Sequence, residues 1–89
     1  MKSDLDIMRS SIEKMDKEIL QAINERMLLS QQIGKLKKDL SIPIQYPEIE
    51  STVRKRYLEY GASHKISGDF CEALAKIILE ESVRIQENP

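Results

Sequence analysis

Residues 5–40 read LDIMRSSIEKMDKEILQAINERMLLSQQIGKLKKDL, and this stretch decides the fold. Its apolar side chains recur at alternating spacings of three and four, which predicts one apolar stripe along an α-helix. Ser3 and Asp6 form a weak capping box at its start, and no proline or glycine interrupts it before Gly34. We therefore expect one helix from about residue 4 to about residue 39. The stripe consists of Leu5, Met8, Ile12, Met15, Ile19, Ala22, Leu29, Ile33, Leu36 and Leu40.

Two shorter helices are expected after this one. Residues 41–46 form a loop, Pro47 suits the first position of a second helix, and Gly61 is a plausible stop for it. After a loop at 62–66, a third helix begins near residues 67–69 and runs to about Gln86. The predicted apolar stripes are Tyr46, Ile49, Val53, Tyr57 and Tyr60, then Phe70, Ala73, Leu74, Ile77, Ile78 and Val83. The fold class is all-α, with a single domain over residues 1–89.

The length of the first helix predicts a dimer. Thirty-five helical residues span about 50 Å, whereas a compact chain of 89 residues has a radius of gyration of only about 12 Å. The helix must protrude from any single-chain core, so a partner has to cover its stripe. A second copy of the chain is the simplest partner, which indicates an intertwined homodimer.

Composition excludes several other classes. The net charge is −1, from 14 basic and 15 acidic residues, which argues against a nucleic-acid or membrane surface. No apolar run approaches the roughly 20 residues of a membrane span, and the first four residues lack the apolar core of a signal peptide. Cys71 is the only cysteine, so we expect a buried thiol in a reducing compartment and a cytoplasmic protein.

Two cations in the first helix are candidates for binding an anion. Arg26 interrupts the apolar stripe, which is costly unless the guanidinium meets a negative charge. It extends its charged end to solvent, pairs with a glutamate across the dimer, or binds a ligand. Lys37 follows about three turns later, so both cations share a face about 16 Å apart and could hold a small dianion. Alternatively, Lys37 belongs to a solvated cluster with Lys35 and Lys38.

Four other polar residues complete the candidate set. Arg9 lies about 25 Å before Arg26 along the axis, so it could reach the same ligand only from a partner chain. Ser82 and Gln86 are spaced i, i+4 and project from one face of the third helix. Glu50 falls in the first turn of the second helix, where the helix dipole favours a carboxylate. Each residue also has an ordinary structural explanation.

The chain lacks the common catalytic motifs. It has no nucleophile–base pair, no metal-ligand cluster and no glycine-rich phosphate loop. We therefore expect no metal and no cofactor. An enzyme with these residues would work by positioning and electrostatics.

Together these residues form a recognisable pattern. The chain resembles the all-helical (type II) chorismate mutases over essentially its whole length. The resemblance is carried by residues 8–16 (MRSSIEKMD), 24–27 (NERM), 33–37 (IGKLK) and 78–86 (ILEESVRIQ). The family pattern is an arginine, then iD, ER, GxxK, a loop entering the second helix, and a terminal SxxxQ. Each motif is weak alone, but all of them occur here in register.

The resemblance implies a domain-entwined homodimer with two sites and chorismate as substrate. Arg26 and the Arg9 of the other protomer would bind the substrate carboxylates. Lys37 and Gln86 would hydrogen-bond the ether oxygen, Glu50 would hold the ring hydroxyl, and Ser82 would lie nearby. The implied reaction is the Claisen rearrangement of chorismate to prephenate in phenylalanine and tyrosine biosynthesis.

Two positions depart from the family pattern and keep other functions open. The family enters the second helix with an aspartate and an arginine–glutamate pair, where this chain has Tyr46, Ile49 and Glu50. The missing arginine removes a cation that the family places at the substrate. One alternative is therefore a non-catalytic or regulatory helical module on the same scaffold. Another is an isochorismate–pyruvate lyase, although such lyases tend to lack the glutamate that this chain retains.

Overall fold

The protein is all-helical. The computed structural model describes residue 1 and residues 3–89, which form three helices and no strand. α1 spans Asp4–Leu40, α2 spans Pro47–Ser63 and α3 spans Gly68–Glu87. The predicted fold class is confirmed, and α1 ends within one residue of its expected limit. Lys2, part of the N-terminal stretch discussed above, lies outside the described residues.

The helix ends follow from local chemistry. The Ser3 hydroxyl accepts a hydrogen bond from the Asp6 backbone N–H at 3.1 Å, which satisfies a free donor in the first turn of α1. Ser67 caps α3 in the same way. Pro47 occupies the start of α2, as predicted. The cap residue before it, Tyr46, makes no side-chain capping bond, as expected where an aspartate is missing.

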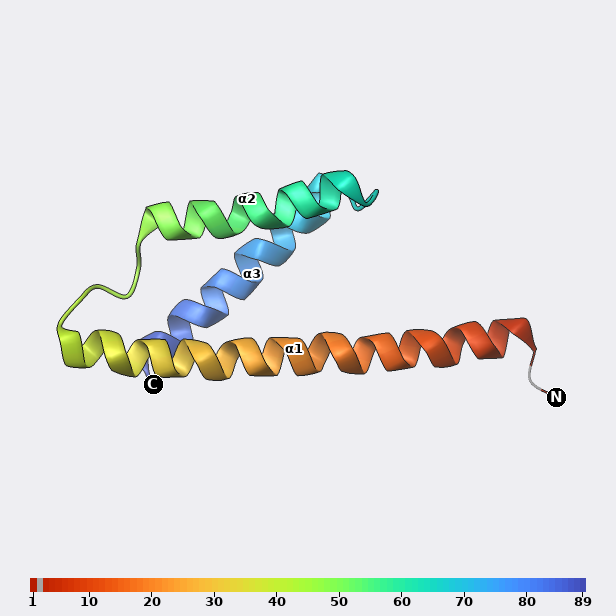
Figure 1. The fold of residues 1–89 in the computed structure, drawn as a ribbon, viewed down its shortest axis with the longest axis horizontal. Coiled ribbons are helices and arrows are strands. Elements are labelled where there is room, and N and C mark those ends of the chain that lie inside the picture. The colour runs from red at the N-terminus through yellow and green to blue at the C-terminus, as the bar shows by residue number, and fades with distance from the viewer. Residues whose placement is uncertain (2) are drawn as a thin grey trace.

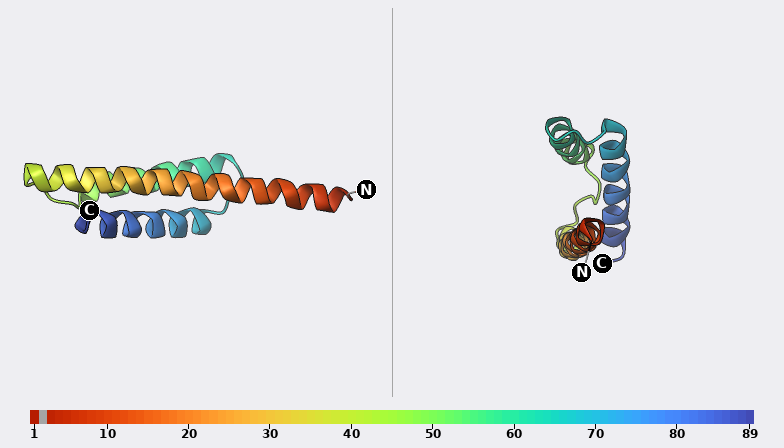
Figure 2. Two further views of the ribbon diagram at one scale, coloured as in Figure 1. Left: turned by 90° about the horizontal axis from the view of Figure 1, so that it is seen from below. Right: turned by 90° about the vertical axis from the view of Figure 1, so that its right-hand side faces the viewer.

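α1 and α2 run roughly parallel to each other, and α3 lies diagonally between them (Figure 1). α3 packs against both α1 and α2 and crosses between them, while α2 is held away from α1 (Figure 1). The first half of α1 extends beyond the other two helices, and the chain measures 59 × 26 × 14 Å (Figure 2). This extended shape agrees with the expectation that the long helix protrudes.

The buried face of α3 differs from the predicted one. Its buried residues are Cys71, Ala75, Ile78 and Ser82, which recur at helical spacing and face the other two helices. Of the predicted stripe, only Ile78 is buried, and Val83 is half-buried. The others, Phe70, Ala73, Leu74 and Ile77, are exposed. The prediction was wrong because small residues let α3 approach both neighbours closely, whereas the larger apolar residues lie outside these contacts.

Gly61 does not end α2. The helix continues to Ser63, and His64 is its cap residue. Gly61 is buried, and a Cβ atom at this position would collide with the Cys71 Sγ atom. The glycine therefore permits close packing of α2 on α3. We expected it to end the helix because glycine is common at helix ends. Within α2, Val53 is the buried member of the predicted stripe, while Ile49 and Tyr60 are exposed.

The apolar stripe of α1 is uncovered in a single chain. Leu5, Met8, Ile12 and Met15 are each at least half exposed, and the buried residues of α1 are Ser30 and Gly34. Among the helices of the described residues, none combines the length and the apolar character that a membrane span requires.

Candidate functional site

A cavity of about 360 Å³ opens where the second half of α1, the loop of residues 41–46, the start of α2 and the end of α3 meet. Five of the six candidate residues line it, namely Arg26, Lys37, Glu50, Ser82 and Gln86. The rest of the wall is mainly apolar and includes Leu29, Ile33, Val53, Leu79 and Val83. The fold thus gathers charged and amide groups from all three helices around one apolar hollow.

Arg9 is the candidate that the structure does not bring to this cavity. It is exposed on the first half of α1, seventeen residues or about 25 Å before Arg26 along the axis. Within one chain, Arg9 and Arg26 therefore cannot share a small ligand.

Lys37 is held in place by two acceptors. Its Nζ atom donates to the Ile44 backbone carbonyl at 2.6 Å and to Gln86 Oε1 at 2.9 Å. The ammonium group also lies 5.4 Å from the centre of the Tyr46 ring. Because an ammonium carries three protons, one N–H remains for a ligand. Contacts with the loop of residues 41–46 and with α3 thus fix the position of the Lys37 ammonium group in the cavity.

The Gln86 amide is held at both ends. Its Oε1 accepts from Lys37, and its Nε2 donates to Ser82 Oγ at 3.3 Å. The Ser82 hydroxyl lies 2.6 Å from that of Ser30, and both serines are almost fully buried, at 6% and 4% exposure. An amide nitrogen has two protons, so Gln86 also keeps one N–H for a ligand.

Gly34 makes this contact between α1 and α3 possible. A Cβ atom at position 34 would lie 2.7 Å from Gln86 Cα and 2.8 Å from the Gln86 carbonyl oxygen. Both are backbone atoms, so no side-chain rotation could relieve the clash. Only glycine lets the last turns of α3 come close enough for Gln86 to reach Lys37.

Arg26 and Glu50 supply opposite charges to the cavity. Arg26 is half-buried, and among the described residues no carboxylate forms an ion pair with it. Glu50 is also half-buried, and its Oε1 accepts a hydrogen bond from Gln45 Nε2 at 3.3 Å. Both groups therefore retain capacity to bind a ligand.

Ile49 and Tyr46, the two departures from the expected pattern, also line the cavity. Ile49 is 59% exposed, so it is a wall residue and not part of the core. Tyr46 presents its ring to the Lys37 ammonium. Where a cation and an acid were expected, the cavity has an aliphatic and an aromatic wall.

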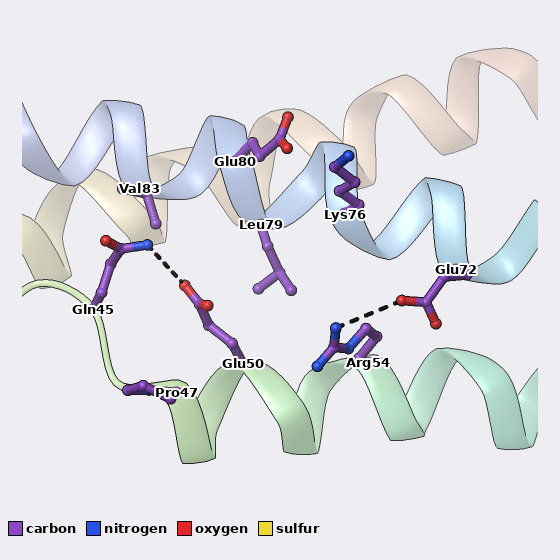
Figure 3. A pocket seen from close by; sticks show the side chains of 9 residues that line it. All are labelled: Gln45, Pro47, Glu50, Arg54, Glu72, Lys76, Leu79, Glu80 and Val83. Carbon is purple, nitrogen blue, oxygen red and sulfur yellow. Dashed lines mark hydrogen bonds and ion pairs between the residues drawn. The ribbon is translucent and has the colours of Figure 1, made fainter.

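A second cavity, of about 470 Å³, lies between α2 and α3. Figure 3 shows Leu79 projecting from α3 between the Gln45–Glu50 contact and the Arg54–Glu72 ion pair. Of the six candidates, Glu50 alone lines this cavity. Arg54, another residue of its wall, is already paired with Glu72 at 3.6 Å. Although larger, this second cavity contains neither Arg26 nor the hydrogen-bonded group of Lys37, Gln86 and Ser82. The smaller cavity is therefore the candidate site.

Two residues elsewhere on α3, Glu81 and Arg84, have shifted pKa values. A hydrogen bond from Arg84 lowers the pKa of Glu81, and the same contact raises the pKa of Arg84. Neither residue lines the candidate site. Among residue 1 and residues 3–89, no group of three His, Cys, Asp or Glu side chains could hold a metal ion.

Sequence reasoning missed Ser30 and the backbone carbonyl of Ile44. Ser30 precedes Gly34 by four residues and Lys37 by seven, so it lies on their face of α1. That spacing could have identified it. The Ile44 carbonyl carries no side-chain signal, and only the path of the loop places it beside Lys37.

The sequence matches a known family over most of its length. The sequence model described as chorismate mutase type II matches residues 8–87. A chorismate mutase from Methanocaldococcus jannaschii is 28% identical over 79 residues, which cover 89% of this chain and 80% of that protein. A 4-amino-4-deoxychorismate mutase from Streptomyces venezuelae is 25% identical over 85 residues, covering 96% of this chain and 82% of that protein.

Longer proteins and a solved structure also match. A bifunctional chorismate mutase/prephenate dehydratase from Aquifex aeolicus is 36% identical over 55 residues, or 62% of this chain, which spans 15% of that protein. A solved conserved hypothetical protein from Pyrococcus furiosus superposes with a TM-score of 0.77 at 29% identity. The superposition covers 97% of this chain and 99% of that one, so the three-helix arrangement is shared.

Proposed function

The chain belongs to the chorismate mutase type II family, and on that premise we propose that it converts chorismate to prephenate, in the biosynthesis of phenylalanine and tyrosine. The observation that carries this proposal is the Lys37–Gln86 pair. Two hydrogen-bond donors with free protons lie side by side in a cavity that also holds Arg26, which forms an ion pair with no carboxylate of the described residues.

The proposed reaction is an intramolecular rearrangement. The C–O bond of the enolpyruvyl ether breaks while a C–C bond forms, and no proton is transferred. Negative charge develops on the ether oxygen as its bond breaks. We propose that the third N–H of Lys37 and the second N–H of Gln86 donate to this oxygen. Because other contacts already hold both groups, they stabilise the charge with little reorganisation.

The remaining candidates would bind and fold the substrate. We propose that Arg26 pairs with one substrate carboxylate and that Glu50 accepts a hydrogen bond from the ring hydroxyl. Ser82 supports the site from its edge through Gln86. Holding a flexible substrate in its compact reactive form contributes to the rate without any covalent step.

We propose that the active form is a homodimer. The uncovered stripe of α1 includes Met8 at 63% exposure and Ile12 at 60%, and a second copy would bury such a surface. An antiparallel partner helix would also carry its own Arg9 toward the cavity, where it would bind the second carboxylate. The site proposed here is therefore shared between two chains.

A chorismate-disappearance assay on the purified protein tests the proposal. Lys37→Ala should lower kcat/KM by about 10²-fold or more, as expected for the loss of one preorganised charged donor. Lys35→Ala is the matched control, because this exposed lysine lies on the same helix and does not line the cavity. It should keep the wild-type rate.

Other results would favour a different function. Release of pyruvate from isochorismate, without turnover of chorismate, would identify a lyase. A folded protein that turns over neither substrate would favour a non-catalytic helical module.

A second substrate is favoured by the Ile49–Glu50 pair. With an aliphatic residue at position 49, no ion pair neutralises Glu50 within the described residues. An unpaired carboxylate binds an ammonium better than a hydroxyl. We therefore propose 4-amino-4-deoxychorismate as the second candidate substrate. Comparing kcat/KM for the two compounds on one enzyme preparation distinguishes them.

A further inference from the structure

We propose that Ser30 is a positioning residue that orients the Gln86 amide through Ser82. The inference rests on the proposed function, because it concerns the proton that Gln86 would offer to the ether oxygen. Ser30 lies on α1, and its hydroxyl is 2.6 Å from that of Ser82 on α3. Gln86 Nε2 donates to the same Ser82 oxygen at 3.3 Å. Two hydrogen bonds thus connect Ser30 on α1 to the Gln86 amide through Ser82.

Burial limits the hydrogen-bond partners that the two serines can find. Ser30 is 4% exposed and Ser82 is 6% exposed, so solvent offers their hydroxyls little alternative. Buried hydroxyls are nearly always hydrogen-bonded, and here each is the other's partner across the helix contact. The contact therefore restrains the side-chain torsions of both serines.

The 2.6 Å distance allows either serine to be the donor, and we use the Gln86 amide to assign the direction. Ser82 Oγ accepts the Gln86 N–H, so the Ser82 proton has to point elsewhere. We assign it to Ser30 Oγ, which lies at hydrogen-bonding distance. In this arrangement Ser82 presents a lone pair to Gln86, and the amide nitrogen faces Ser82 while the amide oxygen faces Lys37.

Removing the Ser30 hydroxyl would disturb this order. The Ser82 proton would lose its acceptor and could turn toward Gln86, where it favours the amide oxygen over the amide nitrogen. Lys37 also requires that oxygen. The Gln86 amide would then populate two orientations, and only one of them leaves an N–H for the substrate.

A double-mutant cycle with Gln86 tests the proposal. Ser30→Ala should lower kcat about threefold to tenfold, the range expected for one hydrogen bond, with KM changed less than about twofold. In a Gln86→Ala background, Ser30→Ala should have no further effect, because the group it orients is gone. An equal loss of kcat in both backgrounds would overturn the proposal and assign Ser30 a purely structural role.

Ser11→Ala is the matched control. This serine is also on α1, but it is exposed, and within the described residues its hydroxyl donates only to the carbonyl of Ile7 in its own helix. It should leave kcat, KM and the circular dichroism spectrum unchanged.

A measurement without substrate separates this proposal from the proposed function. The side-chain NH₂ signals of Gln86 in a ¹H–¹⁵N spectrum can be assigned by their loss in Gln86→Ala. They should shift in Ser30→Ala and stay in place in Ser11→Ala, even if chorismate is not the substrate. Unchanged Gln86 signals in Ser30→Ala would overturn the proposal whatever the enzyme assay shows.

Discussion

Ile49 lies where the resemblance described above predicts an arginine beside the substrate, and its side chain lines the cavity at 59% exposure. Because the position is exposed, an arginine there would not have to be buried without a partner. Its guanidinium would face a substrate that carries two carboxylates. Ile49→Arg should therefore raise kcat/KM for chorismate by about tenfold or more, the value of a charge-assisted hydrogen bond.

Ile49→Met controls for shape at this position, since it changes the side chain without adding charge, and it should produce no gain. If Ile49→Arg folds normally and binds chorismate no better, position 49 is not where the missing cation acts. If 4-amino-4-deoxychorismate is the substrate instead, Ile49→Arg should lower its kcat/KM, because the new cation would pair with Glu50 and compete with the ammonium group.

Gln86 gives a prediction about pH. A neutral amide donates at any pH, so titration at position 86 should add nothing to the pH dependence of the wild-type rate. In Gln86→Glu the new carboxyl group donates only when protonated, and the nearby Lys37 ammonium favours its charged form. Activity of this variant should therefore be present only at low pH and fall as pH rises through the carboxyl pKa, ordinarily about 4.3.

The pH–rate profile of Gln32→Glu is the control, because Gln32 is exposed on α1 and away from the cavity. It should match the wild type. Identical pH–rate profiles for Gln86→Glu and the wild type would show that Gln86 does not contact the reacting atoms.

At the scale of elements, the crossing of α1 and α3 depends on Gly34. Gly34→Ala would place a Cβ atom 2.7 Å from Gln86 Cα, so α3 would have to move. We expect a loss of about 1–3 kcal/mol in stability, typical of overpacking. We also expect activity to fall by about 10²-fold, because a small displacement of a catalytic group can cost that much.

Gly68→Ala is the matched control for this change. A Cβ atom at position 68, the first residue of α3, would meet nothing within 4 Å. Urea unfolding and steady-state kinetics on both variants test the prediction. A Gly34→Ala protein with wild-type stability and rate would show that the crossing distance does not position Gln86.

At the scale of the whole molecule, the proposed dimer predicts complementation. Arg9→Ala and Lys37→Ala should each be nearly inactive, because each damages both sites of its own dimer. A mixed dimer of the two variants would contain one intact site, with Lys37 from one chain and Arg9 from the other. Co-refolding equal amounts should restore about one quarter of the wild-type activity, since about half of the dimers are mixed.

Sedimentation of the wild type at micromolar concentration should accompany this experiment and give about twice the chain mass. A stable folded monomer, or mixed samples no more active than the separate variants, would contradict the shared site.

The sequence alone determined the three helices, because their signals are local. The repeat of apolar residues along α1, the Ser3 cap and the Pro47 start depend only on neighbours a few residues away. The same periodicity placed Arg26 and Lys37 on one face, and all the candidates except Arg9 do line one cavity. Helical spacing is reliable at this range because the geometry of one helix hardly depends on what surrounds it.

Only the tertiary structure decided which faces meet. α3 buries Cys71, Ala75, Ile78 and Ser82, where its larger apolar residues indicated another stripe. The contact that holds Gln86 joins residues 52 positions apart, Ser30 and Ser82, and it requires the missing Cβ of Gly34. Periodicity describes each helix separately, whereas a crossing depends on how closely two backbones can approach, and small residues far apart in the sequence set that distance.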